Sequence, residues 1–127
     1  MIATGAAAVT QAIPGKVAAS DRIQVAALGV NGRGRNHIQG FQELRDVEIP
    51  VVCDPDREVG GQRAPEIEKG YGKKVDVETD LRKAFTRKDI GAVSVATPNH
   101  WHSLATIWAC QAGKDVYARI SILNIYL

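Results

Sequence analysis

Apolar and polar positions alternate between two kinds of stretch along the chain from residue 21 onward. Short apolar runs rich in Val, Ile and Ala recur at intervals, and uninterrupted runs of this kind are typical of strands that are buried on both faces. They predict β-strands at 23–29, 47–54, 74–77, 92–96 and 115–118, with the third a short edge strand.

Between these runs, apolar residues recur at helical spacing. The clearest stripes consist of Ile38, Phe41 and Leu44 within 33–44, and of Leu104, Ile107 and Trp108 within 102–114, where the polar Gln111 follows at the same spacing. Gly113 stands where the C-cap of the second of these helices is expected. Both segments are therefore predicted to be amphipathic helices.

Two further helices are predicted from weaker patterns. The segment 57–72 has helical composition but contains Gly60, Gly61 and Pro65, which weaken a helix and blur its boundaries. The segment 79–85 begins with Thr79, a residue suited to an N-cap position.

Strands that alternate with helices predict an α/β fold, in which helices cover both faces of a parallel sheet. Right-handed crossovers favour a Rossmann-like, doubly wound sheet of about five strands. A flavodoxin-like sheet gives the same alternation, but its phosphate loop is usually rich in Ser and Thr and it does not need an acid after the second strand.

The stretch "GVNGRGRNH" lies between the first predicted strand and the first predicted helix, which is where a dinucleotide-binding glycine motif belongs. Gly29 and Gly34 match the first and third glycines of that motif, and Asn31 takes the middle position beside Gly32. Asn tolerates positive φ, and helix amides beginning near Arg33 would point at a phosphate. A plain tight turn is the alternative.

Asp54 ends the second predicted strand, twenty residues after Gly34. This is the separation expected for a carboxylate that accepts hydrogen bonds from the adenosine ribose. Asp54 would repel the 2′-phosphate of NADP, so NAD is the predicted cofactor and NADP is less favoured. Arg57 would soften this preference, and a turn-forming role for Asp54 is the alternative.

The segment "VATPNHWHS" follows the fourth predicted strand, where doubly wound folds bind their ligands. Thr97, Pro98, Asn99 and His102 are its candidate cofactor contacts, with His102 opening the next helix. Asn99 is equally suited to capping that helix. No metal site is predicted, because His100 and His102 have no third ligand cluster nearby.

Composition narrows the function only slightly. The 127 residues carry a net charge of +2, with 16 basic and 14 acidic side chains of alternating sign, so nucleic acid and membrane partners are not predicted. Cys53 and Cys110, each within an apolar stretch, are interpreted as small core residues of a protein in a reducing compartment.

Over residues 22–117 the chain resembles the N-terminal domain of the Gfo/Idh/MocA oxidoreductases, the glucose-fructose oxidoreductase and inositol dehydrogenase family. The resemblance rests on "VAALGVNGRGRNH", "VVCDPD" and "VATPNHWHSLATIWACQAGKDVY", with the "TPNHWH" segment the most specific. It implies NAD(P) binding, hydride transfer with a sugar or polyol substrate, and a homo-oligomer as one assembly to consider.

The same resemblance implies no catalytic residue in this chain. Family members continue "KDVY" into Glu-Lys-Pro, whereas here Ala118 and Arg119 follow, and Arg119 cannot be assumed to replace a lysine that can lose its proton. The family's C-terminal α/β domain is also absent. A binding module without catalysis and a non-functional fragment are therefore the alternatives to an oxidoreductase domain.

The two ends of the chain are set apart from the dinucleotide-binding domain predicted for 22–118. Residues 1–21 resemble the core of a signal peptide or form an unstructured leader, so the cytoplasm and the periplasm or exterior both remain open. The apolar segment 119–127 is interpreted as an aberrant or truncated tail.

Overall fold

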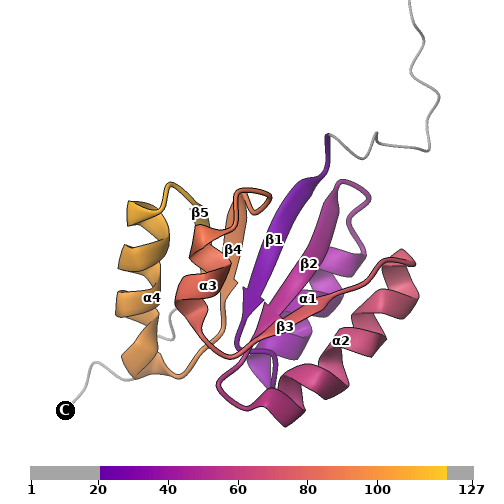
Figure 1. Ribbon diagram of the computed structural model, residues 1–127, viewed down its shortest axis with the longest axis horizontal. Helices are drawn as coiled ribbons and strands as arrows, with labels where there is room; N and C mark the ends of the chain where they lie inside the picture. Colours follow the sequence, from indigo (N-terminus) through magenta and orange to yellow (C-terminus); the bar gives the residue numbers. More distant parts are fainter. Residues whose placement is uncertain (1–20, 120–127) are drawn as a thin grey trace, which may run out of the picture.

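A computed structural model describes residues 21–119 of the chain (Figure 1). The predictions for the leader before residue 21 and for the tail after residue 119 lie outside the described residues. Within the described part, no helix is both long enough and apolar enough to cross a bilayer.

Five strands and four helices alternate along the described residues. The strands are β1 (Ile23–Leu28), β2 (Val47–Cys53), β3 (Asp76–Glu78), β4 (Ala92–Val95) and β5 (Asp115–Ala118). The helices are α1 (Arg33–Gln42), α2 (Arg57–Tyr71), α3 (Leu81–Thr86) and α4 (Asn99–Gln111).

All strand pairs are parallel, and the sheet order is β3-β2-β1-β4-β5. Helices α1 and α2 cover one face of the sheet, and α3 and α4 cover the other (Figure 1). The chain crosses from one face to the other between β3 and β4, so β1 and β4 lie side by side at the switch point of the sheet. This order confirms the Rossmann-like prediction, since a flavodoxin-like sheet has the order 2-1-3-4-5.

The sheet separates two apolar cores. Ala26, Leu28 and Val93 face α3 and α4, whereas Ala27, Val52 and Ile49 face α1 and α2. Alternate residues of β1 and β2 therefore enter opposite cores, which explains why both strands read as nearly continuous apolar runs.

Strand β2 contains a proline in the interior of the sheet. The register with β1 shifts between Gln24 and Ala26, whose partners are Glu48 and Val51, so β2 contains one extra residue at Ile49–Pro50. A bulge tolerates proline because the ladder is already interrupted there.

Helix α2 is continuous in spite of its two glycines and Pro65. Asp56 caps its amino end by accepting from the backbone N–H groups of Glu58 and Val59, and Gly72 ends it with φ +67°. Pro65 is exposed, so water can reach the carbonyl that its ring leaves without an N–H partner.

Several local predictions were wrong. The N-cap of α3 is Asp80 instead of Thr79, with the Asp80 side chain accepting from the Arg82 N–H. Leu44 lies beyond the end of α1 and is exposed, as is Ile107 on α4. Leu44 follows the last turn of α1, whereas Ile107 lies on the exposed side of α4 between the buried residues Ala105 and Ala109.

The remaining errors concern α4, which begins at Asn99 rather than at His102, and Cys110, which is exposed rather than part of the core. Cys53 is buried as predicted. Burial, followed by the nearby carboxylates, raises the pKa of Cys53 to about 12, so its thiol stays protonated.

The glycine predicted at the carboxyl end of α4 is present. Gly113 N–H donates to the Cys110 carbonyl and Lys114 N–H donates to that of Ala109, which is a Schellman motif.

Candidate functional site

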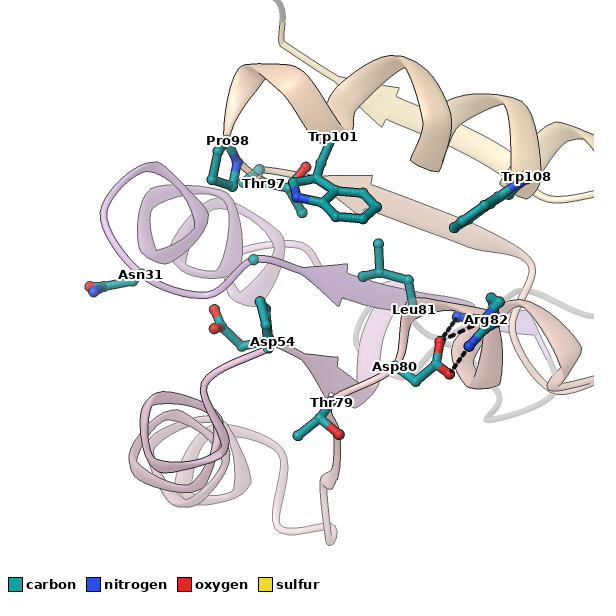
Figure 2. Close-up of a pocket in the computed structure, with 13 residues that line it drawn as sticks. Asn31, Asp54, Thr79, Asp80, Leu81, Arg82, Thr97, Pro98, Trp101 and Trp108 are labelled. Atoms are coloured by element: carbon teal, nitrogen blue, oxygen red, sulfur yellow. Dashed lines mark hydrogen bonds and ion pairs between the residues drawn. The ribbon is translucent and has the colours of Figure 1, made fainter.

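A pocket of about 790 Å³ opens at the carboxyl ends of β1, β2 and β4 (Figure 2). We call it the main pocket. The residues that line it are Gly29, Asn31, Asp54, Pro55, Thr79, Asp80, Leu81, Arg82, Ala96, Thr97, Pro98, Trp101 and Trp108. Ligand sites in proteins typically measure roughly 300–1,000 Å³, so the main pocket has the size of a ligand site.

The glycine loop packs tightly against its neighbours. Gly29 has φ +77°, and a Cβ atom built on it would lie 2.8 Å from the carbonyl carbon of Ala96. A Cβ atom on Gly34 would lie 1.9 Å from the carbonyl oxygen of Gly29. Gly29 therefore permits the turn, and Gly34 permits the close approach of α1 to β1 that the third glycine of the motif predicts.

The middle of the loop differs from the expectation for Asn31. No non-glycine residue of the described part has positive φ, and Gly32, with φ +48°, supplies the second positive φ of the loop. Asn31 instead accepts a hydrogen bond from the Gly32 N–H through Oδ1 at 2.9 Å. Gly32 is the N-cap of α1 and no side chain of the described residues caps this helix. Gly34 N–H donates to the Asn31 carbonyl at 2.9 Å and Arg35 N–H donates to the Gly32 carbonyl at 3.2 Å, so within the described residues the Arg33 N–H is the first-turn amide that remains available to a ligand.

Asp54 connects the end of β2 with the glycine loop. Its Oδ2 accepts from the Val30 N–H at 3.1 Å, and its Oδ1 accepts from the Asp56 N–H at 3.0 Å. An ionised carboxylate has about four acceptor sites, so each oxygen can accept a further hydrogen bond from a ligand. The carboxylate is half-buried at the pocket wall, where the sequence places a ribose acceptor.

The turn before α3 adds pocket residues that the sequence analysis did not assign to the site. Thr79, Asp80, Leu81 and Arg82 line the main pocket beside Asp54. Asp80 accepts from Arg82 Nε at 3.0 Å and from Arg82 Nη2 at 2.8 Å, and these hydrogen bonds lower the pKa of Asp80 (Figure 2). The signal for this turn is its place after β3, because parallel strands all end at the same edge of the sheet.

Aromatic side chains of α4 complete the pocket wall. Trp101 lies across the pocket from Asp54, with Leu81 below its indole and Trp108 further along α4 (Figure 2). Trp101 is 42% exposed, so its ring is open to a ligand. Flat apolar walls of this kind suit an aromatic base.

A second and smaller pocket, of about 130 Å³, lies between the first turns of α1 and α4. We call it the side pocket. It is lined by Arg33, His37, Val95, Ala96, Thr97, Asn99, His102 and Arg119. Thr97 and Ala96 line both pockets, so the two are adjacent.

The predicted site residues are divided between these pockets. Gly29, Asn31, Asp54, Thr97 and Pro98 line the main pocket, whereas Arg33, Asn99 and His102 line the side pocket. Gly32 and Gly34 line neither and act through the backbone of the loop. Pro98, not Asn99, is the N-cap of α4, and His102 is buried with Nδ1 3.3 Å from the Pro98 carbonyl oxygen. Among residues 21–119 no three His, Cys, Asp or Glu side chains could share a metal ion.

Comparison with known families agrees with this arrangement. The sequence model of the GFO_IDH_MocA family, described as "Oxidoreductase family, NAD-binding Rossmann fold", matches residues 23–118. The chain belongs to this family. The matched range begins at β1 and ends at β5, so it contains the whole sheet and the helices between its strands. These elements form the NAD-binding Rossmann domain of the Gfo/Idh/MocA oxidoreductase family.

Curated relatives carry a different name. A "Glycosyl hydrolase family 109 protein" of Shewanella baltica is 32% identical over 104 residues, which is 79% of this chain and 23% of the relative. An "Alpha-N-acetylgalactosaminidase" of Shewanella oneidensis is 31% identical over the same length and the same shares. This Gfo/Idh/MocA chain thus spans about a quarter of the length of the relatives it matches.

Solved structures share the fold. GenD2 from gentamicin A biosynthesis, in complex with NAD, superposes with a TM-score of 0.67 at 25% identity, covering 85% of this chain and 29% of GenD2. The myo-inositol 2-dehydrogenase of Lactobacillus plantarum superposes with a TM-score of 0.68 at 19% identity, covering 76% of this chain and 27% of that one. The second similarity concerns the fold alone.

Proposed function

We propose that this Gfo/Idh/MocA domain binds NAD in the main pocket and positions it for hydride transfer with a carbon of a sugar or polyol. The observation that carries the proposal is the Asp54–Val30 hydrogen bond, which holds the Asp54 carboxylate beside the glycine loop, where a ribose acceptor would be needed. Gly29 and Gly34 allow close backbone contacts of the loop with Ala96 and within the loop itself, which a Cβ atom would obstruct, and such packing is expected of the first and third glycines of a dinucleotide-binding loop.

The roles of the individual residues follow from their places. The Arg33 amide in the first turn of α1 would hold the pyrophosphate, because α1 has no side-chain cap and its dipole favours negative charge. Asp54 would accept from the adenosine ribose hydroxyls, and Trp101 would cover the base. Thr97, Pro98 and Asn99 would hold the nicotinamide half. NAD, when bound, supplies the hydride acceptor.

The charges of the main pocket favour NAD over NADP. Two carboxylates, Asp54 and Asp80, line the pocket wall, and a 2′-phosphate near them would be repelled. Arg82 also lines the pocket, but its guanidinium is engaged by the Asp80 carboxylate. Arg57 is exposed at the start of α2 and does not line the pocket.

A sugar substrate is supported by the name of one relative, the alpha-N-acetylgalactosaminidase of Shewanella oneidensis. The same name favours glycoside cleavage as a second candidate function. Oxidation accumulates NADH, whereas hydrolysis leaves the cofactor's redox state unchanged. Release of p-nitrophenol from a p-nitrophenyl glycoside, measured beside NADH absorbance, separates the two.

Cofactor binding is tested by titrating the chain with NADH and with NADPH. Trp101 and Trp108 are the two tryptophans of the sequence and both line the main pocket, so their fluorescence should fall as NADH binds. Binding without turnover would support a binding module. Absent binding together with uptake of a hydrophobic dye would support a non-functional fragment.

The variant Asp54→Ala should weaken NADH binding roughly tenfold to a hundredfold, because hydrogen bonds to a charged group contribute about 1.5–3 kcal/mol. The ratio of the NADPH to the NADH dissociation constant should fall, because the charge that repels the 2′-phosphate is removed. Asp54→Asn keeps an acceptor for the Val30 N–H and should lower this ratio with a smaller loss of NADH affinity. Asp46→Ala, which removes an exposed carboxylate at the opposite end of the sheet, is the control. Unchanged affinity of Asp54→Ala for both cofactors would remove Asp54 from the site.

A further inference from the structure

Helix α4 differs from the other helices in its charge. The other three helices of the described part contain charged residues, such as Arg82 and Lys83 in α3, whereas the 13 residues of α4 contain no Asp, Glu, Lys or Arg. The sequence on both sides of α4 is uncharged as well, over the whole of residues 90–113. Surface helices usually carry charged side chains on the side that faces water. α4 therefore presents an unusually uncharged surface to the solvent.

The side of α4 that faces the solvent is distinct from the sides that face the sheet and the cofactor. Ala105 and Ala109 are buried against the sheet, and Trp101 and Trp108 line the main pocket. Figure 1 shows α4 at the outer side of the domain, with α3 and the sheet on its inner side. We call the remaining side the outer face of α4, which consists of His100, Ser103, Leu104, Ile107, Cys110 and Gln111. None of these residues lines either pocket.

The outer face has an apolar centre and a polar border. Ile107 lies in the middle of the face and is 53% exposed, and Leu104 lies one turn before it and is half-buried. Ser103 and Gln111 lie one turn to either side of Ile107, and their neutral side chains can both donate and accept hydrogen bonds. An apolar centre that lacks charge and has a polar rim is typical of protein–protein interfaces.

The absence of charge indicates which partner the outer face fits. In an interface with two-fold symmetry, a residue near the axis meets its own copy, so a charged side chain there would oppose a like charge. The first charged residue after α4 is Lys114, and its ammonium donates to the carbonyl oxygens of Arg87 and Ile90 at 2.6 and 2.7 Å. It is therefore engaged within its own chain. The outer face thus contains no group that would repel a second copy of itself.

We propose that the outer face is a dimer interface, in which α4 packs antiparallel against α4 of a second copy of this chain, around a two-fold axis at Ile107. Ser103 of one copy then lies opposite Gln111 of the other, because the two residues are equally far from Ile107 along the helix. The inference goes beyond the proposed function, since the outer face lies outside both pockets and its test does not depend on cofactor binding.

The size of the outer face sets the expected strength of the dimer. A helix of 13 residues is roughly 20 Å long and about 10 Å wide, so the pair buries less than the roughly 800 Å² per partner of a standard interface. The dimer should therefore be weak, with a dissociation constant on the order of 10 µM or above.

The test is sedimentation equilibrium of the full chain in reducing buffer, at concentrations on the order of 1 µM to 1 mM, which bracket that dissociation constant. The mass should rise from the 13.7 kDa of one chain toward twice that value. Ile107→Arg places two like charges at the axis and should weaken association about a hundredfold or more. Leu44→Arg is the matched control, because it adds the same charge at another exposed apolar residue outside the outer face, and it should associate as the unmodified chain does.

A third variant separates a lost interface from a lost fold. Ile107→Glu alone should also stay monomeric, but its equimolar mixture with Ile107→Arg should associate, because opposite charges then meet at the axis. A chain that keeps the mass of one copy over the whole range would leave the outer face to a different protein and overturn the proposal. Undiminished association of Ile107→Arg, an equal loss in Leu44→Arg, or a mixture that does not associate would overturn it as well.

Discussion

Gly34 makes the strongest prediction about the glycine loop. In Gly34→Ala the new methyl carbon would lie 1.9 Å from the carbonyl oxygen and 2.7 Å from the carbonyl carbon of Gly29, where real Cβ atoms essentially never come under 3.0 Å. Both obstructing atoms belong to the backbone, so no side-chain rotation relieves the overlap. The first turn of α1 must move by roughly 1 Å, which displaces the loop from β1.

The cost follows from overpacking. Forcing a methyl group into a packed interior costs about 1–3 kcal/mol, and a backbone obstruction places Gly34→Ala at the upper end or beyond. Gly40→Ala is the matched control, because Gly40 lies in the same helix and a Cβ there meets nothing within 4 Å. Alanine is the better helix former, so Gly40→Ala should stabilise the domain by about 0.5–1 kcal/mol.

The assay is urea unfolding of the three chains, followed by far-ultraviolet circular dichroism. The expected order of unfolding midpoints is Gly40→Ala highest, the unmodified chain next and Gly34→Ala lowest. NADH binding should also be lost in Gly34→Ala under folding conditions, because the displaced loop no longer presents its amides. Equal midpoints for Gly34→Ala and the unmodified chain would refute the close approach of α1 to Gly29.

Two further predictions concern stability away from the pockets. Burial alone would raise the pKa of Glu48, but hydrogen bonds from Lys73, Gln24 and Arg22 outweigh it and hold the pKa below its ordinary 4.5. This stabilisation is present above pH 4.5 and is lost as the pH falls through the lowered pKa, so Glu48→Gln should flatten the acid limb of a stability–pH curve. Gly72→Ala should lower stability by about 1 kcal/mol in thermal unfolding, because the helix ends there with φ +67°.

The fold was predictable because its signals are local and repeated. Each strand is a short apolar run, and each crossover helix has its own stripe or cap, so the order of elements follows from the sequence alone. The errors lie at helix ends. Asp80 takes the cap in place of Thr79 because Asp is the stronger acceptor and stands directly before Leu81, where α3 begins.

The candidate site was predictable in part, because its strongest signals are backbone requirements. Gly29, Gly34 and Asp54 have a fixed spacing along the chain, and the structure brings them together at one edge of the sheet. Trp101 and Leu81 were not predicted to line the main pocket. They meet there because α3 lies close to α4, and a spacing along the sequence does not show which helices are neighbours. The side pocket was missed for the same reason, since its arginines come from opposite ends of the domain.

The glycine loop and Asp54 act as one unit, which affects how variants of either must be interpreted. The loop is tied to β2 by Gly29 N–H donating to the Cys53 carbonyl at 2.8 Å and by Val30 N–H donating to Asp54. On its other side, Ala96 N–H donates to the Leu28 carbonyl at 2.8 Å. Removing the Asp54 carboxylate therefore takes away both the proposed ribose acceptor and a restraint on the loop. Asp54→Asn removes the charge and leaves one acceptor oxygen, which can keep the Val30 N–H hydrogen bond but not the Asp56 N–H hydrogen bond as well. The difference in NADH affinity between the Asn and Ala variants therefore measures what this hydrogen bond to the loop and the remaining amide contribute together.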